Sequence, residues 1–448
     1  MDENPLLDSL RKARLARRQR QRDDAPPPAM PASPARGTAA FDFSALPAHK
    51  QVRLTQAVAD IAQLASPFFR VHDTARAPLT SIGGQACINF GSYNYLGLND
   101  HPEVRAAACA AIDAWGISAG ASRLVGGEHP FHRPLEEDLA EALGTEDCIV
   151  MVSGHATNVT TIGTLMGQRD LVLVDGLIHN SVSEGVRLSG ATRMSFPHND
   201  WAWLDETLGR VRRQYERALI VVEGLYSMDG DHPDLPRFVE VKARHDAWLM
   251  VDEAHSLGVL GPTGRGIAEH QGVDPRSVEI WMGTLSKTLS SCGGYIAGSR
   301  ALAETLRYTA PGFVFSVGLA APIAAAARKS LEIMLREPER VARLARNGRL
   351  FRDRAQEAGL DTGHSAGYAV TPVIIGDSLR TALVADDLLK SGVNVLPIIA
   401  PAVPDKQARL RFFLTSEHAE AQILTAIEAT AAAVAQRQSE DVMARLKG

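Results

Sequence analysis

The sequence has few cysteines and no long apolar run, and both absences exclude classes of protein. Its 448 residues include four cysteines, and none of them forms a CxxC pair. This spacing argues against a zinc site and against a disulfide framework, so we expect no bound metal and reduced thiols in the cytoplasm. The four are Cys87, Cys109, Cys148 and Cys292.

Neither a membrane span nor a signal peptide is expected. No stretch reaches the about 18 uncharged apolar residues that a transmembrane helix requires. The N-terminus opens with Asp2 and Glu3 and lacks the apolar core of a signal peptide. The net charge of −5 does not favour a nucleic-acid partner. With 45% hydrophobic residues, the chain instead has the composition of a globular protein with a sizeable core.

Residues 1–45 differ in composition from the rest of the chain and are predicted to form a flexible arm. Residues 11–22 are a basic run, and residues 25–36 are rich in proline, alanine and serine, which is typical of extended or disordered segments. The arm is either a solvated tail or a docking segment for an acidic partner, such as an acyl carrier protein or an anionic membrane surface. Both interpretations stay open.

From Cys148 onward, short apolar runs alternate with helical patterns. Several runs consist almost wholly of β-branched and aliphatic residues, as in strands that are buried on both faces of a sheet. The predicted strands lie at residues 148–152, 171–174, 218–222, 247–251, 279–282 and 295–297. We therefore predict an α/β fold with a mostly parallel sheet covered by helices.

The chain is predicted to divide further after the arm. Residues 46–95 form an N-terminal segment, and residues 96–335 form the large α/β domain. After that the pattern changes, and helical stretches flank two predicted strands at 369–375 and 409–414. Residues 336–448 are therefore predicted to be a smaller C-terminal α+β domain.

Ligands of open α/β sheets bind beyond the carboxyl ends of the parallel strands, so the residues after each apolar run matter most. Five consecutive runs are followed by glycines, hydroxyls, imidazoles, carboxylates or an amine. These residues are Ser153, Gly154, His155, Asp175, His179, Glu223, Ser227, Asp252, His255, Thr284, Ser286 and Lys287. Strand ends of this composition predict the rim of an active site.

Asp252 and Lys287 carry most of the functional argument. Asp252 ends one apolar run in the motif VDEAH, and Lys287 follows the next run, in GTLSK. An enzyme that uses pyridoxal phosphate (PLP) needs a lysine to hold the cofactor aldehyde as a Schiff base and an acid to pair with the pyridinium nitrogen. Alone, the two residues would be interpreted as a surface lysine and a helix cap. At consecutive strand ends they predict a PLP site.

Two further strand ends suit the same cofactor. Ser153 and Gly154 precede a helix-like stretch, and the N–H groups of a helix N-terminus bind phosphate. His179 follows another run and could stack on a flat ring. Each signal is weak alone, because many helices begin this way without a ligand and a single histidine more often satisfies local hydrogen bonds.

Five segments bear distinctive motifs in a fixed order along the chain. They are SYNYLG (92–97), SRLVGG (122–127), EGLYSMDGD (223–231), DEAHSLGVLGPTGRG (252–266) and GTLSKTLSSCGGY (283–295). As a set they resemble the α-oxoamine synthases, a family of fold-type I PLP enzymes, and most of all its serine palmitoyltransferases. The resemblance implies a large, mostly parallel sheet of the seven-stranded type, a smaller C-terminal domain, and a homodimer whose active sites are shared between the subunits.

The resemblance also implies roles for single residues. Lys287 matches the lysine of the Schiff base, Asp252 the partner of the pyridinium nitrogen, and His179 the histidine stacked on the ring. His255 matches the histidine that contacts the phenolic oxygen of the cofactor and, in some members, the incoming acyl group. The other predicted cofactor contacts are Ser153, Gly154, His155, Ser227, Ala254, Thr284, Ser286 and, from the other subunit, Ser316.

The predicted substrate side departs from the family at one position. Several members bind the substrate carboxylate through the arginine of an Arg-Pro-Pro segment, but Ile399 stands at that position here. Arg411 matches a second arginine of the family, and a planar guanidinium suits a carboxylate. Arg411 is therefore the predicted carboxylate ligand, with Tyr93 and Asn94 as further substrate-side residues.

The reaction that the resemblance implies is a decarboxylative condensation of the Claisen type. A small L-amino acid would react with an acyl thioester of coenzyme A or of an acyl carrier protein and give an α-amino ketone. The motifs favour L-serine, with glycine or alanine next, in a sphingolipid-type or polyketide pathway. One alternative is a PLP aminotransferase, which needs the same lysine and acid. The other is a non-catalytic partner subunit, against which the presence of Lys287 argues.

Overall fold

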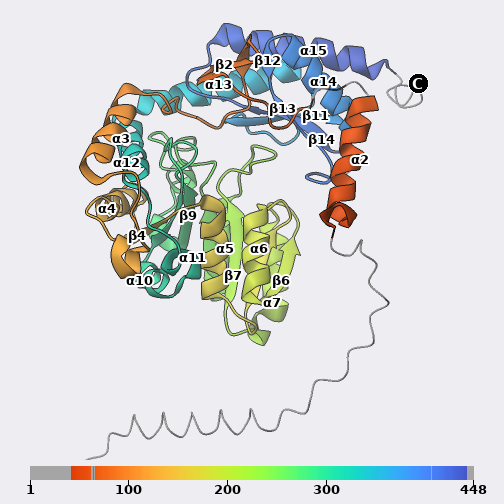
Figure 1. Cartoon of the computed structure of the whole chain (residues 1–448). Coiled ribbons are helices and arrows are strands. Elements are labelled where there is room, and N and C mark those ends of the chain that lie inside the picture. The colour runs from red at the N-terminus through yellow and green to blue at the C-terminus, as the bar shows by residue number, and fades with distance from the viewer. Residues whose placement is uncertain (1–41, 62–63, 65, 405, 441–448) are drawn as a thin grey trace, which may run out of the picture. The chain divides into compact units, whose positions relative to one another are not determined.

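The chain divides into two compact units, Met1–Asp60 and Ile61–Gly448. The computed structural model of the protein describes residues 42–61, 64, 66–404 and 406–440 (Figure 1). The first unit has two helices among its described residues, η2 (Phe43–Ala45) and the largely exposed α2 (Pro47–Ile61). The basic run of the predicted arm lies outside the described residues, so the role of the arm stays a prediction.

The second unit is built on a sheet of seven strands in the order β4-β10-β9-β8-β7-β5-β6. Of these strands only β10 runs antiparallel to its two neighbours, β4 and β9. The strands are β4 (Asp147–Met151), β5 (Leu171–Asp175), β6 (Thr192–Phe196), β7 (Ala218–Glu223), β8 (Trp248–Asp252), β9 (Ile280–Thr284) and β10 (Gly294–Gly298). The predicted α/β fold with its mostly parallel sheet is confirmed.

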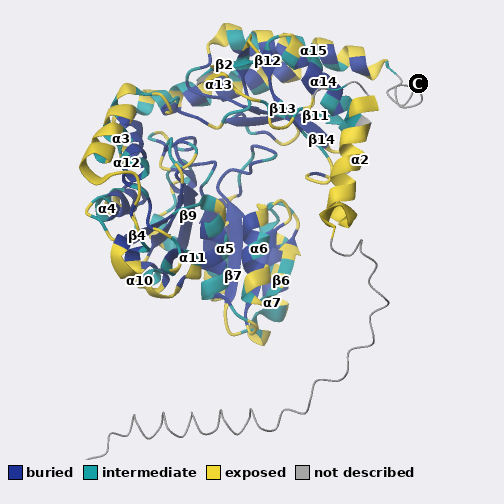
Figure 2. Ribbon diagram, viewed as in Figure 1, coloured by how far each residue is buried: buried dark blue, intermediate teal, exposed yellow. Residues whose placement is uncertain are grey.

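The inner strands are buried on both faces because helices cover the sheet. Every residue of β5, β7 and β9 is buried, and these strands are dark blue in Figure 2. Figure 1 shows α5 (Gly154–Leu165) and α6 (Asn180–Ser189) against one face. A strand covered on both faces needs apolar side chains at every position, which is why the apolar runs predicted these strands to within two residues.

Two features of the sheet were not predicted. The edge strand β6 was missed, because residues along it alternate between the sheet and solvent and include polar side chains. The antiparallel direction of β10 was missed because its apolar run gives no direction. Residues 285–293 are too short a connection for the helical crossover that joins parallel strands, so β9 and β10 pair as an antiparallel neighbour pair.

The rest of the second unit contains two smaller sheets. One has the strand order β1-β2-β3-β12 and the other β11-β14-β13. Their strands are β1 (Thr74–Arg76), β2 (Leu79–Ile82), β3 (Gln85–Asn89), β11 (Val370–Gly376), β12 (Val393–Asn394), β13 (Leu396–Ile398) and β14 (Ala408–Phe413). Since β12 pairs in parallel with β3, the predicted N-terminal segment shares a sheet with the predicted C-terminal domain. The domain boundaries at 95/96 and 335/336 stay predictions.

The remaining helices pack around these sheets. They are α3 (Pro102–Trp115), η3 (Arg123–Gly127), α4 (His132–Leu143), α7 (Trp201–Val211), η4 (Arg212–Gln214), α8 (Leu235–Arg244), α9 (Ile267–Gln271), η5 (Pro275–Ser277), α10 (Arg300–Thr309), α11 (Pro311–Val314), α12 (Ala321–Arg336), α13 (Pro338–Glu357), α14 (Ser378–Lys390) and α15 (Glu420–Gln438). Within the described ranges, no helix is both long enough and apolar enough to cross a membrane.

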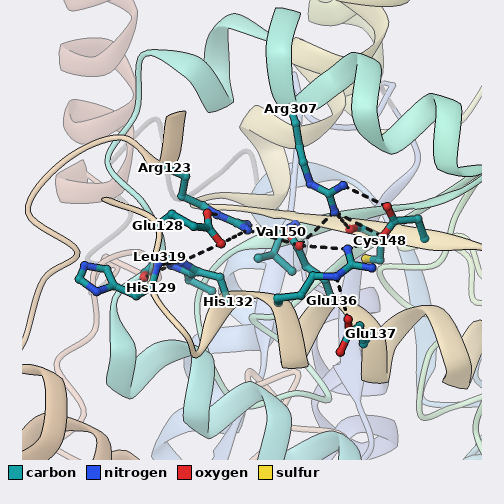
Figure 3. A network of polar contacts seen from close by, with 12 residues as sticks. Arg123, Glu128, His129, His132, Glu136, Glu137, Cys148, Val150, Arg307 and Leu319 are labelled. Atoms are coloured by element: carbon teal, nitrogen blue, oxygen red, sulfur yellow. Dashed lines mark hydrogen bonds and ion pairs between the residues drawn. The ribbon is translucent and has the colours of Figure 1, made fainter. Parts of the chain in front are cut away.

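A buried carboxylate joins three helices to the edge of the large sheet (Figure 3). Glu136 of α4 is completely buried, and its Oε1 accepts hydrogen bonds from Nη1 of Arg123 (2.5 Å) and from the backbone N–H of Val150 (3.0 Å). Its Oε2 accepts a bond from Nη2 of Arg307 in α10 (3.0 Å). Two guanidinium groups therefore compensate the burial of this carboxylate and hold the SRLVGG segment against β4.

A second charged cluster joins the ends of β5 and β6. The two ring nitrogens of His198 lie 2.8 Å from carboxylate oxygens of Asp175 and Asp231. The backbone N–H of Asn199 donates to the other oxygen of Asp175 (2.8 Å). Burial alone would lower the pKa of His198, but the two carboxylates raise it to about 10. His198 is therefore protonated in the folded protein at neutral pH.

We predict that His198→Gln destabilises the protein by about 2 kcal/mol at pH 6, the size of a lost charge-assisted hydrogen bond. Because the pKa of His198 is raised on folding, its contribution is complete below pH 6.5 and is lost as the pH rises to about 10. Urea unfolding at pH 6 and pH 10 tests this. The matched control is His364→Gln at an exposed histidine. An equal loss of stability at the two pH values would contradict the prediction.

Candidate active site

A cavity of about 300 Å³ opens at the carboxyl ends of the parallel strands β4, β5, β7, β8 and β9. This is the edge of the sheet at which the sequence predicts an active site. Its lining consists of Tyr93, Ser153, Gly154, His155, Asn158, His179, Ser181, Glu223, Asp252, Ala254, His255, Met282, Thr284, Ser286, Lys287, Cys292 and Gly293.

Asp252 is the best-anchored group in the cavity. It ends β8, is buried, and its two oxygens accept different hydrogen bonds. Nδ2 of Asn158 donates to Oδ2 (2.9 Å), and the backbone N–H of Ala254 donates to Oδ1 (2.9 Å). Since both bonds require an acceptor, the carboxylate is held in its ionised form. It is therefore suited to pair with a cationic ring nitrogen.

Hydrogen bonds continue from Asp252 to a histidine ring. Nδ2 of Asn158 also donates to Oγ of Ser181 (2.9 Å), and this hydroxyl lies 2.7 Å from Nδ1 of His179. His179 is the N-cap of α6, and its ring is exposed. The ring of His155 meets it edge-on at 6.3 Å. His179 is thus held at one atom while its face stays open for stacking.

Lys287 brings an amine into the cavity from the loop after β9. It is largely buried, and its Nζ lies 5.7 Å from the centroid of the Tyr93 ring. Among the described residues, no carboxylate lies within ion-pair distance of it. Burial lowers the pKa of Lys287 to about 8. A larger share of the amine than usual is therefore unprotonated near neutral pH, as attack on an aldehyde requires.

The first turn of α5 faces a group of hydroxyls. Ser153 caps the helix by accepting a hydrogen bond from the N–H of Ala156 (3.3 Å), and Gly154 is its first residue. Across from it, Oγ1 of Thr284 and Oγ of Ser286 lie 2.8 Å apart. A Cβ at Gly154 would come within 2.8 Å of Oγ1 of Thr284, so only glycine leaves this space free. Helix N–H groups and hydroxyls together fit a phosphate.

Glu223 is a second buried carboxyl group beside Asp252. It ends β7, its Oε2 accepts a hydrogen bond from the N–H of Ser227 (3.2 Å), and its Oε1 has no partner among the described residues. Burial, followed by the negative charge of Asp252, raises the pKa of Glu223 to about 8. Glu223 is therefore largely neutral at pH 7, and Asp252 is left as the anion of the pair.

These features fit PLP. The amine of Lys287 can hold the aldehyde, Asp252 can face the ring nitrogen, the open face of His179 can stack on the ring, and the space left by Gly154 can take the phosphate. Each requirement is met by a different strand end of the same cavity.

Eleven of the fifteen residues that we predicted for the site lie in the cavity lining. They are Tyr93, Ser153, Gly154, His155, His179, Asp252, Ala254, His255, Thr284, Ser286 and Lys287. Asn94, Ser227, Ser316 and Arg411 are not in this lining. Their roles, and the contacts that the eleven would make with ligands, stay predictions.

The positions of these four residues have local causes. Oδ1 of Asn94 accepts the N–H of Leu98 (2.9 Å) and so serves its own turn, which argues against the predicted substrate contact. Ser227 is buried, and its carbonyl accepts a hydrogen bond from Nη1 of Arg411 (3.1 Å). Ser316 was predicted to act in the other subunit's site, and it lies far along the chain from the strand ends, beside the exposed Phe315.

Three functional residues were missed by sequence analysis: Asn158, Ser181 and Glu223. Asn158 lies four residues after Gly154, which is one helical turn and the same face of α5, so the spacing contained the signal. Ser181 lies two residues after His179, where a serine usually only supports a helix start. Glu223 was noted at a strand end, but its burial beside Asp252 appears only in three dimensions.

Comparison with known proteins places this site in a family. Residues 85–429 match the family model of aminotransferase class I and II. The chain is 42% identical over 354 residues to the 8-amino-7-oxononanoate synthase of Symbiobacterium thermophilum, across 79% of this chain and 90% of that protein. It is 38% identical over 329 residues to the 4-hydroxy-2,2'-bipyrrole-5-methanol synthase PigH of Serratia sp., across 73% of this chain and 50% of that protein.

Solved structures agree with the sequence comparison. The serine palmitoyltransferase of S. paucimobilis, with PLP bound, superposes with a TM-score of 0.85 at 29% identity, across 89% of this chain and all of that one. The serine palmitoyltransferase of Sphingomonas wittichii gives a TM-score of 0.83 at 31% identity, across 87% and 97%. The family model, these relatives and the cavity together show that the chain belongs to the aminotransferase class I and II family and, within it, to the PLP-dependent α-oxoamine synthases.

Proposed function

We propose that this enzyme condenses L-serine with an acyl thioester and releases carbon dioxide and an α-amino ketone. The observation that carries this proposal is an unpaired arginine, Arg411, near the amine of Lys287. The enzyme would thus have a place for the substrate carboxylate as well as for the cofactor.

The cofactor contacts follow from the cavity. Bound PLP supplies an electron-accepting ring that delocalises the charge left when a bond to the substrate α-carbon breaks. Asp252 holds a proton on the ring nitrogen, and its own anchors, Asn158 and the N–H of Ala254, keep it in place. Lys287 anchors the cofactor before the substrate arrives and then becomes a free amine beside the α-carbon. With its pKa lowered by burial, this amine can accept the α-proton.

Two arginines on β14 show why Arg411 suits a carboxylate. Arg409 is buried and pairs with Asp229 (2.7 Å). Arg411 is two residues along on the same face, but among the described residues no carboxylate lies within ion-pair distance of it. Its Nη1 donates to the carbonyl of Ser227, and its buried Nε has no partner. A largely buried guanidinium without an anion is costly, and a substrate carboxylate would remove that cost.

The names of the relatives point to two amino acids. The serine palmitoyltransferases name serine, and the product named for the Serratia relative carries a methanol group, the side chain that serine would supply. The product 8-amino-7-oxononanoate carries its amino group next to a terminal methyl group, as alanine would supply. The motifs SYNYLG and DEAHS favour serine, so serine is proposed first, alanine second and glycine third.

The acyl donor and the oligomeric state are further parts of this proposal. Coenzyme A and an acyl carrier protein are both candidate carriers, with the basic run at residues 11–22 as a contact for the acidic carrier. The product would enter a sphingolipid-type or polyketide pathway with serine, or biotin synthesis with alanine. A homodimer is proposed because Phe315 and Val317, on either side of Ser316, are 85% and 48% exposed in the single chain. A partner subunit would cover these apolar side chains and receive Ser316.

We expect the PLP-loaded enzyme to release carbon dioxide only when L-serine and an acyl thioester are present together. Lys287→Ala should abolish both this reaction and the visible absorption band of the lysine-bound cofactor. Product analysis with serine, alanine and glycine, each with an acyl-coenzyme A, measures the choice of amino acid. If an amino acid alone consumes the band and a keto acid restores it, the enzyme is an aminotransferase instead.

Replacement of Arg411 should weaken amino-acid binding selectively. In Arg411→Lys the charge stays but the planar pair of donors is lost, so we expect the KM for serine to rise about tenfold or more, the equivalent of about 1.5 kcal/mol or more. The KM for the acyl thioester should change less than about twofold, since the carboxylate belongs to the amino acid. Steady-state kinetics with each substrate varied in turn provide the measurement. An unchanged KM for serine would remove Arg411 from the site.

Gly154→Ala tests the phosphate position. The new Cβ would lie 2.8 Å from Oγ1 of Thr284 and occupy the space beside the helix N-terminus. We expect the dissociation constant for PLP to rise about tenfold, the equivalent of about 1.4 kcal/mol. Titration of the cofactor-free protein with PLP measures it. Gly209→Ala is the matched control, because a Cβ there comes no closer than 3.8 Å to another side chain. Equal affinity in all three proteins would contradict the assignment.

A further inference from the structure

A buried tyrosine lies behind the histidine of the DEAH motif. Tyr95 is completely buried, and its hydroxyl oxygen lies 2.6 Å from Nδ1 of His255. Its ring also meets the ring of Phe413 edge-on at 6.3 Å. Among the described residues, Nδ1 of His255 is the only hydrogen-bond partner of this hydroxyl. The pair is thus enclosed in the protein on the side away from the cavity.

The loop around Tyr95 is fixed at several points. The carbonyl of Tyr95 accepts a hydrogen bond from the N–H of Ser416 (2.8 Å). The preceding residue, Asn94, closes the turn by accepting the N–H of Leu98 on its side chain. The turn that was predicted to touch substrate through Asn94 therefore acts as a rigid support for the next residue along the chain.

His255 presents its other nitrogen to the cavity. The residue is part of the cavity lining, and because Nδ1 faces Tyr95, Nε2 on the opposite side of the ring faces the cavity. Burial, followed by the charges of Lys287, Arg411 and His179, lowers the pKa of His255 well below its ordinary value. The imidazole is therefore neutral and carries a single N–H, on either Nδ1 or Nε2.

We infer that Tyr95 is a positioning residue that fixes His255 in the tautomer with its proton on Nε2. If Nδ1 carried the proton, the tyrosine would have to accept, and its own buried O–H would have no acceptor among the described residues. An unpaired buried donor costs enough to bias a two-state equilibrium about tenfold to a hundredfold. Tyr95 therefore donates to Nδ1, and His255 faces the cavity with a donor instead of a lone pair.

This assignment gives His255 a defined direction of hydrogen bonding. An Nε2–H can donate to an oxygen that gains negative charge, either the phenolic oxygen of the cofactor or the carbonyl oxygen of the acyl thioester; the second case rests on the proposed function. The other tautomer would turn a lone pair toward the same oxygen and repel it. The hydroxyl of Tyr95 thus acts on the reaction without touching substrate or cofactor.

Nitrogen NMR of the full-length, PLP-loaded enzyme with nitrogen-15-labelled histidine tests the inference. The signals of His255 are assigned by their loss in His255→Gln. In the unaltered enzyme we expect a protonated Nε2 and an unprotonated Nδ1. In Tyr95→Phe, which keeps the ring and removes the hydroxyl, the two shifts should move toward each other as both tautomers are populated. With the ring no longer held at Nδ1, kcat should fall about tenfold and the KM for the amino acid should change less than about twofold.

A second tyrosine–histidine pair provides the matched control. The hydroxyl of Tyr368 lies 2.9 Å from Nε2 of His270, and neither residue lines the cavity. Tyr368→Phe should therefore leave the His255 signals and kcat unchanged. A proton on Nδ1 of His255 in the unaltered enzyme, or shifts and kcat that are unaffected by Tyr95→Phe, would overturn the inference. If the expected spectra are found but no acyl thioester is consumed, the proposed reaction fails and the tautomer assignment stands.

Discussion

The arrangement of the cavity depends on the burial of one anion, the carboxylate of Asp252. A buried carboxylate is stable only when hydrogen bonds replace the water that it has lost, and here Asn158 and the N–H of Ala254 do so. Because Asn158 lies on α5, the same bond fixes the helix whose N-terminus faces the hydroxyls of Thr284 and Ser286. The phosphate position and the ring-nitrogen position are thereby set at a constant distance from each other by a single side chain.

The other ionisable groups of the cavity respond to this anion and to the low local dielectric. Glu223 is raised toward neutrality beside Asp252, Lys287 is lowered toward the free amine, and His255 is held neutral. The cavity thus contains one negative carboxylate, one unpaired guanidinium and several neutral donors and acceptors. Such a set favours reactions in which charge forms transiently on the ligand, because few fixed charges compete for it.

Much of this arrangement was predictable from the sequence, for physical reasons. Strands covered on both faces need unbroken apolar runs, so β5, β7 and β8 were located, and the residues that follow them in the chain had to meet at one edge. Pattern alone could not reveal β6, whose polar residues face solvent, or the direction of β10. The partners of side chains were also hidden. Arg409 and Arg411 look equivalent in sequence, and only the fold pairs the first with Asp229 and leaves the second free of a carboxylate.

The position of β10 between β4 and β9 has a consequence for biosynthesis. Gly294 at the start of β10 lies directly against Gly154, and β10 pairs with a strand that was made well over a hundred residues earlier. Contacts between such distant segments form slowly, since a long loop must close first. A chain emerging from the ribosome can therefore assemble its phosphate cradle only after β10 has been translated. Until then it has no complete cofactor site, and PLP can stabilise only the product of this last closure.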